Sequence, residues 1–132
     1  MRSLGIELSG SELIYVLVDI SDDVRIVAKN KLELAHTRDR NALVAFQTAL
    51  RAVYNELAPE IIGIKEKPEK GKLSAGASAL KMEGIALASS PCNVRFVSGT
   101  KVNKCKAQSD DLKKYQLPAY KVAVLSAEMA ND

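Results

Sequence analysis

Charged residues gather in one short segment of the chain, directly after an apolar run. Residues 61–64 have the length and β-branched content of a buried strand, and Glu66 follows two positions later. The ammonium groups around this carboxylate belong to Lys65, Lys70 and Lys72. Lysine is a point-charge ligand for phosphate, and ligands of open α/β sheets bind at the carboxyl ends of the strands. The segment is therefore either a phosphate-binding site or an exposed charged loop without a function of its own.

A second candidate acid lies in the first apolar run. Glu7 alternates with apolar neighbours, so its side chain is expected on the opposite face of the strand from Ile6. On a central strand covered by helices that face is also interior, and a buried carboxylate must be paired, protonated or bound to a metal. Two interpretations stay open. Glu7 forms an ion pair with Lys65 or Lys81, or it belongs to a functional centre together with Glu66.

The composition is that of one globular domain over residues 1–132, with 47% hydrophobic and 27% charged residues. Two cysteines without a CxxC spacing and a single histidine argue against a zinc site. Any metal would be Mg²⁺ or Mn²⁺ on carboxylates. No apolar run approaches the roughly 20 residues that cross a bilayer, and the start of the chain reads directly into a strand. A cytoplasmic protein without membrane contact is expected.

The positive charge is concentrated in the second half of the chain. Residues 1–60 hold 7 Lys/Arg against 9 Asp/Glu, whereas residues 61–132 hold 12 against 7. A basic half suits a polyanionic partner such as nucleic acid, with DNA favoured over RNA. Ordinary surface lysines are the alternative interpretation of the same excess.

Apolar periodicity predicts an α/β fold. Five strands are expected, at residues 3–9, 12–19, 24–34, 61–64 and 94–97. Three helices are expected, at about 39–57, 73–90 and 117–129, and residues 99–115 are either a short exposed helix or a loop. Short turns make the first three strands an antiparallel meander, and right-handed crossovers make the last two parallel.

This order of elements resembles that of the ribonuclease H-like superfamily. LGIELSG at 4–10, IIGIKEK at 61–67 and SALKMEGIALASS at 78–90 are similar to the first strand, the fourth strand and the following helix of RuvC-type Holliday junction resolvases. The chain is also similar to a family of small uncharacterised bacterial proteins with a VGVEL opening and an IKER-x-x-KGK-x-x-GGA segment. The resemblance implies a five-stranded mixed sheet, a three-strand antiparallel meander plus two parallel strands, with flanking helices.

The superfamily resemblance also implies a chemistry. Its nucleases hold two divalent ions on four carboxylates against the scissile phosphate. Carried over to this sequence, the first two acids are Glu7 and Glu66, as catalytic and metal-binding residues, with Mg²⁺ or Mn²⁺ as the cofactor. The other two lie in a Pro-x-Asp-x-x-Asp pattern on the last helix, where this chain has Tyr120 and Ala123. The acids that could supply a third metal ligand are Glu83 and Glu128.

Two functions are therefore expected as alternatives. The first is a RuvC-like nucleic-acid-binding domain in which Lys65, Lys70, Lys72 and Lys81 contact phosphates. Such a domain is either a divergent Mg²⁺-dependent nuclease with an incomplete acidic site or no longer catalytic, so enzyme status stays open. The second is a non-catalytic protein-interaction module on the same fold. The small residues of the helix at 73–90 also suggest a homodimer contact.

Overall fold

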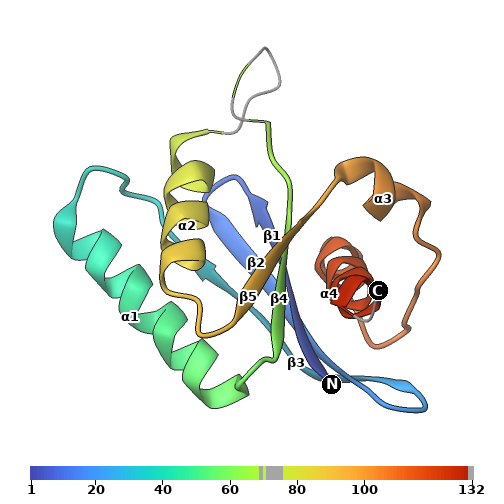
Figure 1. Ribbon diagram of the computed structural model, residues 1–132. Coiled ribbons are helices and arrows are strands. Elements are labelled where there is room, and N and C mark those ends of the chain that lie inside the picture. The colour runs from blue at the N-terminus through green and yellow to red at the C-terminus, as the bar shows by residue number, and fades with distance from the viewer. Residues whose placement is uncertain (69, 71–75, 131–132) are drawn as a thin grey trace.

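The computed structural model describes residues 1–68, 70 and 76–130. Within them, five strands form one mixed sheet in the order β3-β2-β1-β4-β5 (Figure 1). The strands are β1 Arg2–Ser9, β2 Glu12–Ile20, β3 Val24–Glu33, β4 Ile61–Lys65 and β5 Asn93–Val97. The helices are α1 Arg40–Leu57, α2 Ala77–Ala88, α3 Gly99–Lys104 and α4 Leu117–Ala130, with a 3-10 turn at Lys114–Gln116 before α4.

The pairing of the strands confirms the predicted fold class. Strands β1, β2 and β3 are antiparallel neighbours, and β4 is parallel to both β1 and β5. The turn between β1 and β2 contains Gly10 with a φ of 59°, a left-handed conformation that glycine adopts without steric cost. The predicted strands agree with the observed ones, apart from shifts of one or two residues at their ends.

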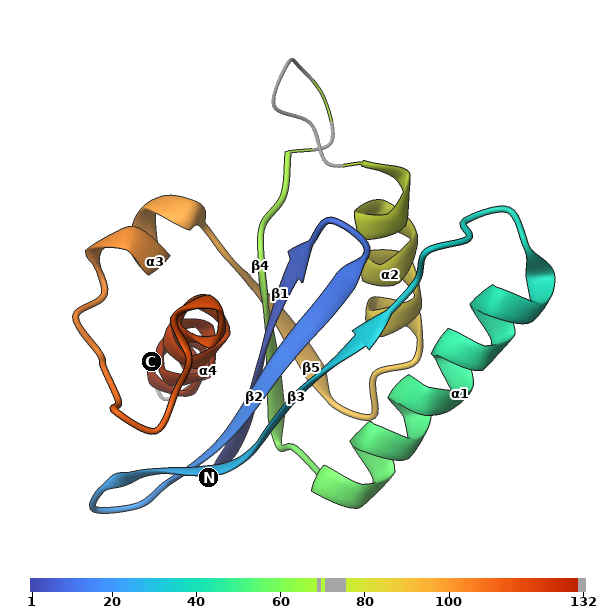
Figure 2. The same ribbon diagram turned by 180° about the vertical axis from the view of Figure 1, so that it is seen from behind.

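The helices cover the two faces of the sheet unequally (Figures 1 and 2). Helices α1 and α2 lie on one face, and α4 lies on the other. Alternation divides the strand side chains between two cores, because neighbours in a strand point to opposite faces. Leu4, Ile6 and Leu8 of β1 pack on the α1/α2 face, whereas Val16 and Val18 of β2 pack against α4.

Local signals explain where the helices begin and end. The Asp39 side chain accepts a hydrogen bond from the backbone N–H of Asn41 at 3.0 Å, which caps α1. The helix ends at Ala58 in a left-handed conformation, one residue before Pro59. The helix predicted at 73–90 is observed as α2, and its first predicted residues, 73–75, lie outside the described part of the chain. In the segment 99–115, α3 is the short helix that was one of the two expectations.

Helix α4 lies close to the middle of the sheet, because the strand residues that it covers there, Gly5 and Gly63, have no side chains. A Cβ atom on Gly5 would lie 1.9 Å from the carbonyl oxygen of Ala119, and one on Gly63 would lie 1.8 Å from Oγ of Ser126. The Ser3 hydroxyl donates a buried hydrogen bond of 2.6 Å to the carbonyl oxygen of Ala123. These contacts hold α4 over β1 and β4.

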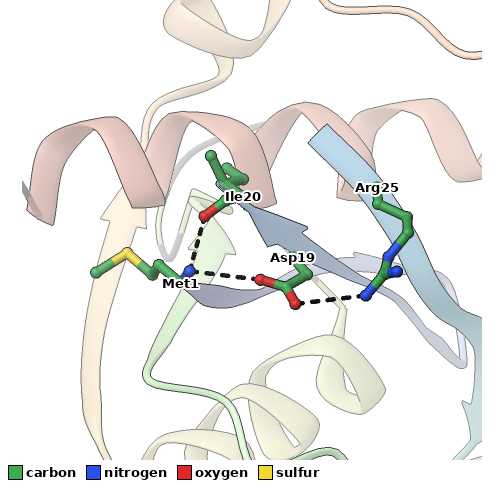
Figure 3. Close-up of polar contacts among 4 residues, drawn as sticks. All are labelled: Met1, Asp19, Ile20 and Arg25. Atoms are coloured by element: carbon green, nitrogen blue, oxygen red, sulfur yellow. Dashed lines mark hydrogen bonds and ion pairs between the residues drawn. The ribbon is translucent and has the colours of Figure 1, made fainter. Parts of the chain in front are cut away.

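The beginning of the chain is tied to the far end of β2 (Figure 3). The ammonium group of Met1 donates to the carbonyl oxygen of Ile20 at 2.7 Å and lies 3.4 Å from Oδ1 of Asp19. The other oxygen of Asp19 lies 3.6 Å from Arg25. Exposed ion pairs of this kind contribute about 0–1 kcal/mol each.

None of the helices in the described ranges is long and apolar enough to cross a membrane.

Candidate functional site

Glu7 lies on the face of the sheet that α4 covers. Gly5 faces α4, and residues two apart in a strand point to the same side, so Glu7 does as well. Its cross-strand neighbour in β2 is the buried Ile14. Only 9% of Glu7 is exposed, as expected for a carboxylate on an inner face. A carboxylate in this position needs a charged or hydrogen-bonding partner.

The partner is Lys65. The parallel register aligns Gly5 with Gly63 and Ile6 with Ile64, so the next residues, Glu7 and Lys65, are neighbours on the α4 face. The Nζ atom of Lys65 lies 3.1 Å from Oε2 of Glu7, and their side chains are 22% and 12% exposed. Of the two interpretations of Glu7 that the sequence left open, the geometry agrees with the ion pair.

Glu66 lies one position later and consequently on the other side of the sheet. Its backbone N–H donates to the carbonyl oxygen of Val97 at 2.8 Å, which continues the pairing of β4 with β5 by one residue. Its exposed side chain lines a cavity of about 460 Å³. The other lining residues are Lys67, Glu83, Leu87 and Phe96. The side chains of Glu7 and Glu66 thus project from opposite faces of the sheet, whereas a functional centre shared by both was one of the two interpretations that the sequence left open. The reason is the period of two in a strand.

The donor set around Glu7 does not fit a divalent metal ion. Mg²⁺ and Mn²⁺ need several oxygen ligands, and a two-ion site needs several carboxylates. Among the described residues no group of three or more His, Cys, Asp or Glu side chains could hold an ion. Tyr120 and Ala123 lie buried in α4, and Glu128 is exposed near its end. The charge of Glu7 is already balanced by Lys65.

Lysines follow the carboxyl ends of β4 and β5, near this ion pair. β1, β4 and β5 are parallel, so their carboxyl ends share one edge, where Figure 1 shows the residues directly after β4 and helix α3. A Cβ on Gly99 of α3 would lie 3.9 Å from Cε of Lys65, which places the first turn of α3 beside that lysine. We call Lys67, Lys70, Lys101 and Lys104 the basic edge.

Of the four lysines of the basic edge, the sequence analysis named only Lys70 as a phosphate ligand. Lys70 is exposed, as a phosphate ligand must be, and Lys72 lies outside the described residues. Lys101 and Lys104, both exposed, were not singled out. The signal that could have found them is the position of the residues that follow the fifth strand, because parallel strands end at a common edge.

Lys81 belongs to another part of the molecule. Its ammonium group donates to the carbonyl oxygen of Thr37, in the loop before α1. It also lines a groove between α1 and α2. Its hydrogen-bond partner is thus not Glu7, which the sequence analysis offered as one possibility.

The groups whose pKa is displaced do not mark an activated nucleophile. Burial raises the pKa of the Cys92 thiol, which disfavours the reactive thiolate. Burial likewise raises the pKa of Tyr15, Tyr54 and Tyr120. Tyr54 is a structural group, since its hydroxyl donates a buried hydrogen bond of 2.9 Å to the carbonyl oxygen of Ala86.

Comparison with known protein families identifies the family of the chain. Residues 1–126 match the family described as Protein of unknown function (DUF3010). The chain belongs to this family. A search of curated proteins finds no significant match.

Solved structures define the fold of this DUF3010 member. RuvC of Thermus thermophilus superposes with a TM-score of 0.77 at 12% identity, over 99% of this chain and 96% of RuvC. The same RuvC in complex with a Holliday junction substrate gives 0.73 at 14%, over 99% and 95%. The yeast mitochondrial Holliday junction resolvase Ydc2 gives 0.54 at 10%, over 86% and 57%. These likenesses confirm a RuvC-like, ribonuclease H-like fold.

Proposed function

We propose that this protein binds nucleic acid, DNA in preference to RNA, along the basic edge and does not cleave it by metal-dependent hydrolysis. The observation that carries the proposal is the Lys65 ammonium 3.1 Å from the Glu7 carboxylate. Both charges lie on the α4 face, where the resemblance to resolvases leads one to expect acids around metal ions.

The ion pair explains why this chain would bind nucleic acid without cleaving it. A divalent ion is attracted by excess negative charge, and two-ion hydrolysis requires carboxylates on both sides of the ions. Here the ammonium of Lys65 neutralises Glu7, and Glu66 projects from the other face. The ammonium group of Lys65 thus takes the place of a metal cation beside Glu7. The lysines of the basic edge then supply the positive charge that meets the phosphates of a nucleic acid.

The arrangement of the basic edge suits a phosphate backbone. Its lysines come from the loop after β4 and from α3, two segments that adjoin at Lys65 and Gly99. Phosphate contacts of this type supply sequence-independent affinity that weakens as salt rises. A RuvC of the same fold has been solved with a Holliday junction, which supports DNA as the nucleic acid to test first.

The proposal is tested by fluorescence anisotropy with a labelled DNA duplex and a labelled four-way junction, titrated at several salt concentrations. We expect binding that weakens steeply with salt, with a slope near −0.9 per phosphate contact. The variant Lys101→Ala with Lys104→Ala should make that slope shallower by about 1–2. The variant Arg25→Ala with Arg51→Ala removes the same charge from two exposed positions elsewhere and should leave the slope unchanged.

Two results would contradict the proposal. Absence of binding to either DNA at low salt would favour a protein-interaction module instead. Cleavage of the junction in Mg²⁺ or Mn²⁺, abolished in Glu7→Gln, would show that the ion pair is opened by metal and that the protein is a nuclease.

A further inference from the structure

A groove of about 650 Å³ lies on the α1/α2 face, away from the ion pair under α4. It runs between α1, α2 and the loop that precedes α1. The residues that line it are Thr37, Arg38, Arg40, Leu43, Val44, Gln47, Lys81, Gly84 and Ile85. Its size is within the range of sites that bind small molecules or the side chains of a peptide.

Hydrogen bonds from α2 to α1 and to the loop before α1 hold the walls of the groove in place. At one end, Lys81 of α2 donates to the carbonyl oxygen of Thr37. At the other, Nε2 of Gln47 lies 3.4 Å from Oγ of Ser89. The buried bond from Tyr54 to Ala86 fixes the helices below it. The groove is therefore preformed, which lowers the entropic cost of binding.

The groove combines an apolar floor with a cationic rim. Leu43, Val44 and Ile85 supply the floor, and Val44 is 41% exposed. The rim carries the three positive charges of Arg38, Arg40 and Lys81, and its lining residues include no carboxylate. An apolar surface of this kind suits a side chain rather than a phosphate backbone, while the rim selects negative charge.

Gly84 is the unusual residue of the groove. It lies inside α2, where glycine costs about 1 kcal/mol relative to alanine. Gly5 and Gly63 are needed because α4 approaches them, but a Cβ on Gly84 would meet no atom within 4 Å. The packing of this chain therefore gives no reason for a glycine there. Its absent side chain leaves space for a group from outside.

We propose that this groove binds an acidic peptide segment of another protein, which places one large apolar side chain over Gly84 and its carboxylates on the arginine and lysine rim. Arg38 and Arg40 can each hold a carboxylate with two parallel hydrogen bonds. Asp39 between them does not compete, because its side chain caps α1. The proposal does not depend on nucleic-acid binding, since the basic edge uses other lysines.

The test is a selection from a display library of random 12-residue peptides on the intact protein, followed by anisotropy with the enriched peptides. We expect enriched peptides with acids on either side of a large apolar residue. Their affinity should fall at least tenfold in Gly84→Leu, which fills the groove, and in Arg38→Glu with Arg40→Glu, which reverses the rim. Arg51→Ala, on the exposed face of α1, is the control that should bind as the wild type does.

Gly84→Leu is designed to fold, because the position is exposed and leucine is a good helix former. Its melting temperature and its DNA binding should equal or exceed those of the wild type, so lost peptide binding cannot be lost structure. The proposal is overturned if no peptide is enriched, if enriched peptides lack acids, or if they bind Gly84→Leu as well as wild type. It is also overturned if the wild type dimerises and Gly84→Leu is monomeric, since the groove would then be a contact between copies.

Discussion

The Nζ atom of Lys65 lies 3.1 Å from Oε2 of Glu7, and both side chains emerge from adjacent parallel strands on the face that α4 covers. An ion pair in this place is mostly withdrawn from water, so removing either partner leaves the other charge without a counter-charge. A single substitution can reverse this pairing of opposite charges.

Replacing the lysine by an acid should turn the pair into a weak metal site. In Lys65→Glu two carboxylates face each other, and the protein should lose roughly 2–4 kcal/mol of unfolding free energy. Because a divalent ion relieves the repulsion, millimolar Mn²⁺ should raise the melting temperature of this variant and not that of the wild type. Arg51→Glu makes the same charge change at an exposed position of α1, away from Glu7, and is the control. An equal Mn²⁺ shift in the wild type would show that it already binds metal.

Removing the charge of Glu7 should affect stability and not DNA binding. Glu7→Gln leaves Lys65 half-buried without a counter-charge and should cost about 1–3 kcal/mol in urea unfolding. Glu12→Gln breaks the more exposed pair of Glu12 and Lys31, at 2.8 Å, and should destabilise the protein less than Glu7→Gln does. The salt slope of DNA binding should be the same in both variants. A change of slope confined to Glu7→Gln would place Glu7 in the binding site.

Two glycines should respond in opposite ways to the same substitution. Gly63→Ala forces a Cβ against Ser126 of α4 and should destabilise the protein by about 3 kcal/mol or more. Gly84→Ala meets no atom within 4 Å and improves the helix, so it should stabilise by about 0.5–1 kcal/mol. Thermal melts of the two variants give the comparison. Partial recovery of Gly63→Ala by Ser126→Gly would show that the α4 contact is the cause.

The buried phenol of Tyr54 predicts a dependence on alkaline pH. Tyr54→Phe loses the bond to Ala86 and should be about 1 kcal/mol less stable than the wild type at pH 8. The pKa of Tyr54 is raised in the folded protein, so its contribution is complete below the unfolded value near 10 and is lost as pH rises above it. The difference between the two proteins should therefore shrink above about pH 10.

Urea unfolding from pH 8 to 11 measures this effect. Tyr15 and Tyr120 also have raised pKa values, but they are present in both proteins and cancel in the comparison. Ser3→Ala removes another buried hydroxyl bond, to Ala123, without removing a titrating group. The loss of unfolding free energy in Ser3→Ala should be independent of pH. If this loss decreased with pH in parallel with that of Tyr54→Phe, the cause would be general alkaline unfolding and not the ionisation of Tyr54.

Much of the architecture could be predicted from local patterns. Alternating apolar residues in β1 have the period of a strand, and the stripe in α1 that includes Phe46 and Leu50 has the period of a helix. The continuous apolar run in β2 has the length and the flanking turns of a buried strand. Short turns and right-handed crossovers then leave few topologies. The position of α4 could not be predicted from local patterns. Its close approach to the sheet depends on Gly5 and Gly63, which lie side by side in strands that are distant in sequence.

The candidate site shows the limit of the same reasoning. The sequence by itself determined that Glu7 is buried, that it needs a partner, and that a charged loop follows β4. Only the tertiary structure decided which residue the partner is. The parallel register aligns Gly-Ile-Glu at 5–7 with Gly-Ile-Lys at 63–65, and one residue along a strand reverses the face. Lys65 therefore pairs with Glu7, and the side chain of Glu66 lies on the opposite face of the sheet. This outcome depends on the register between two strands, which neither strand sequence specifies alone.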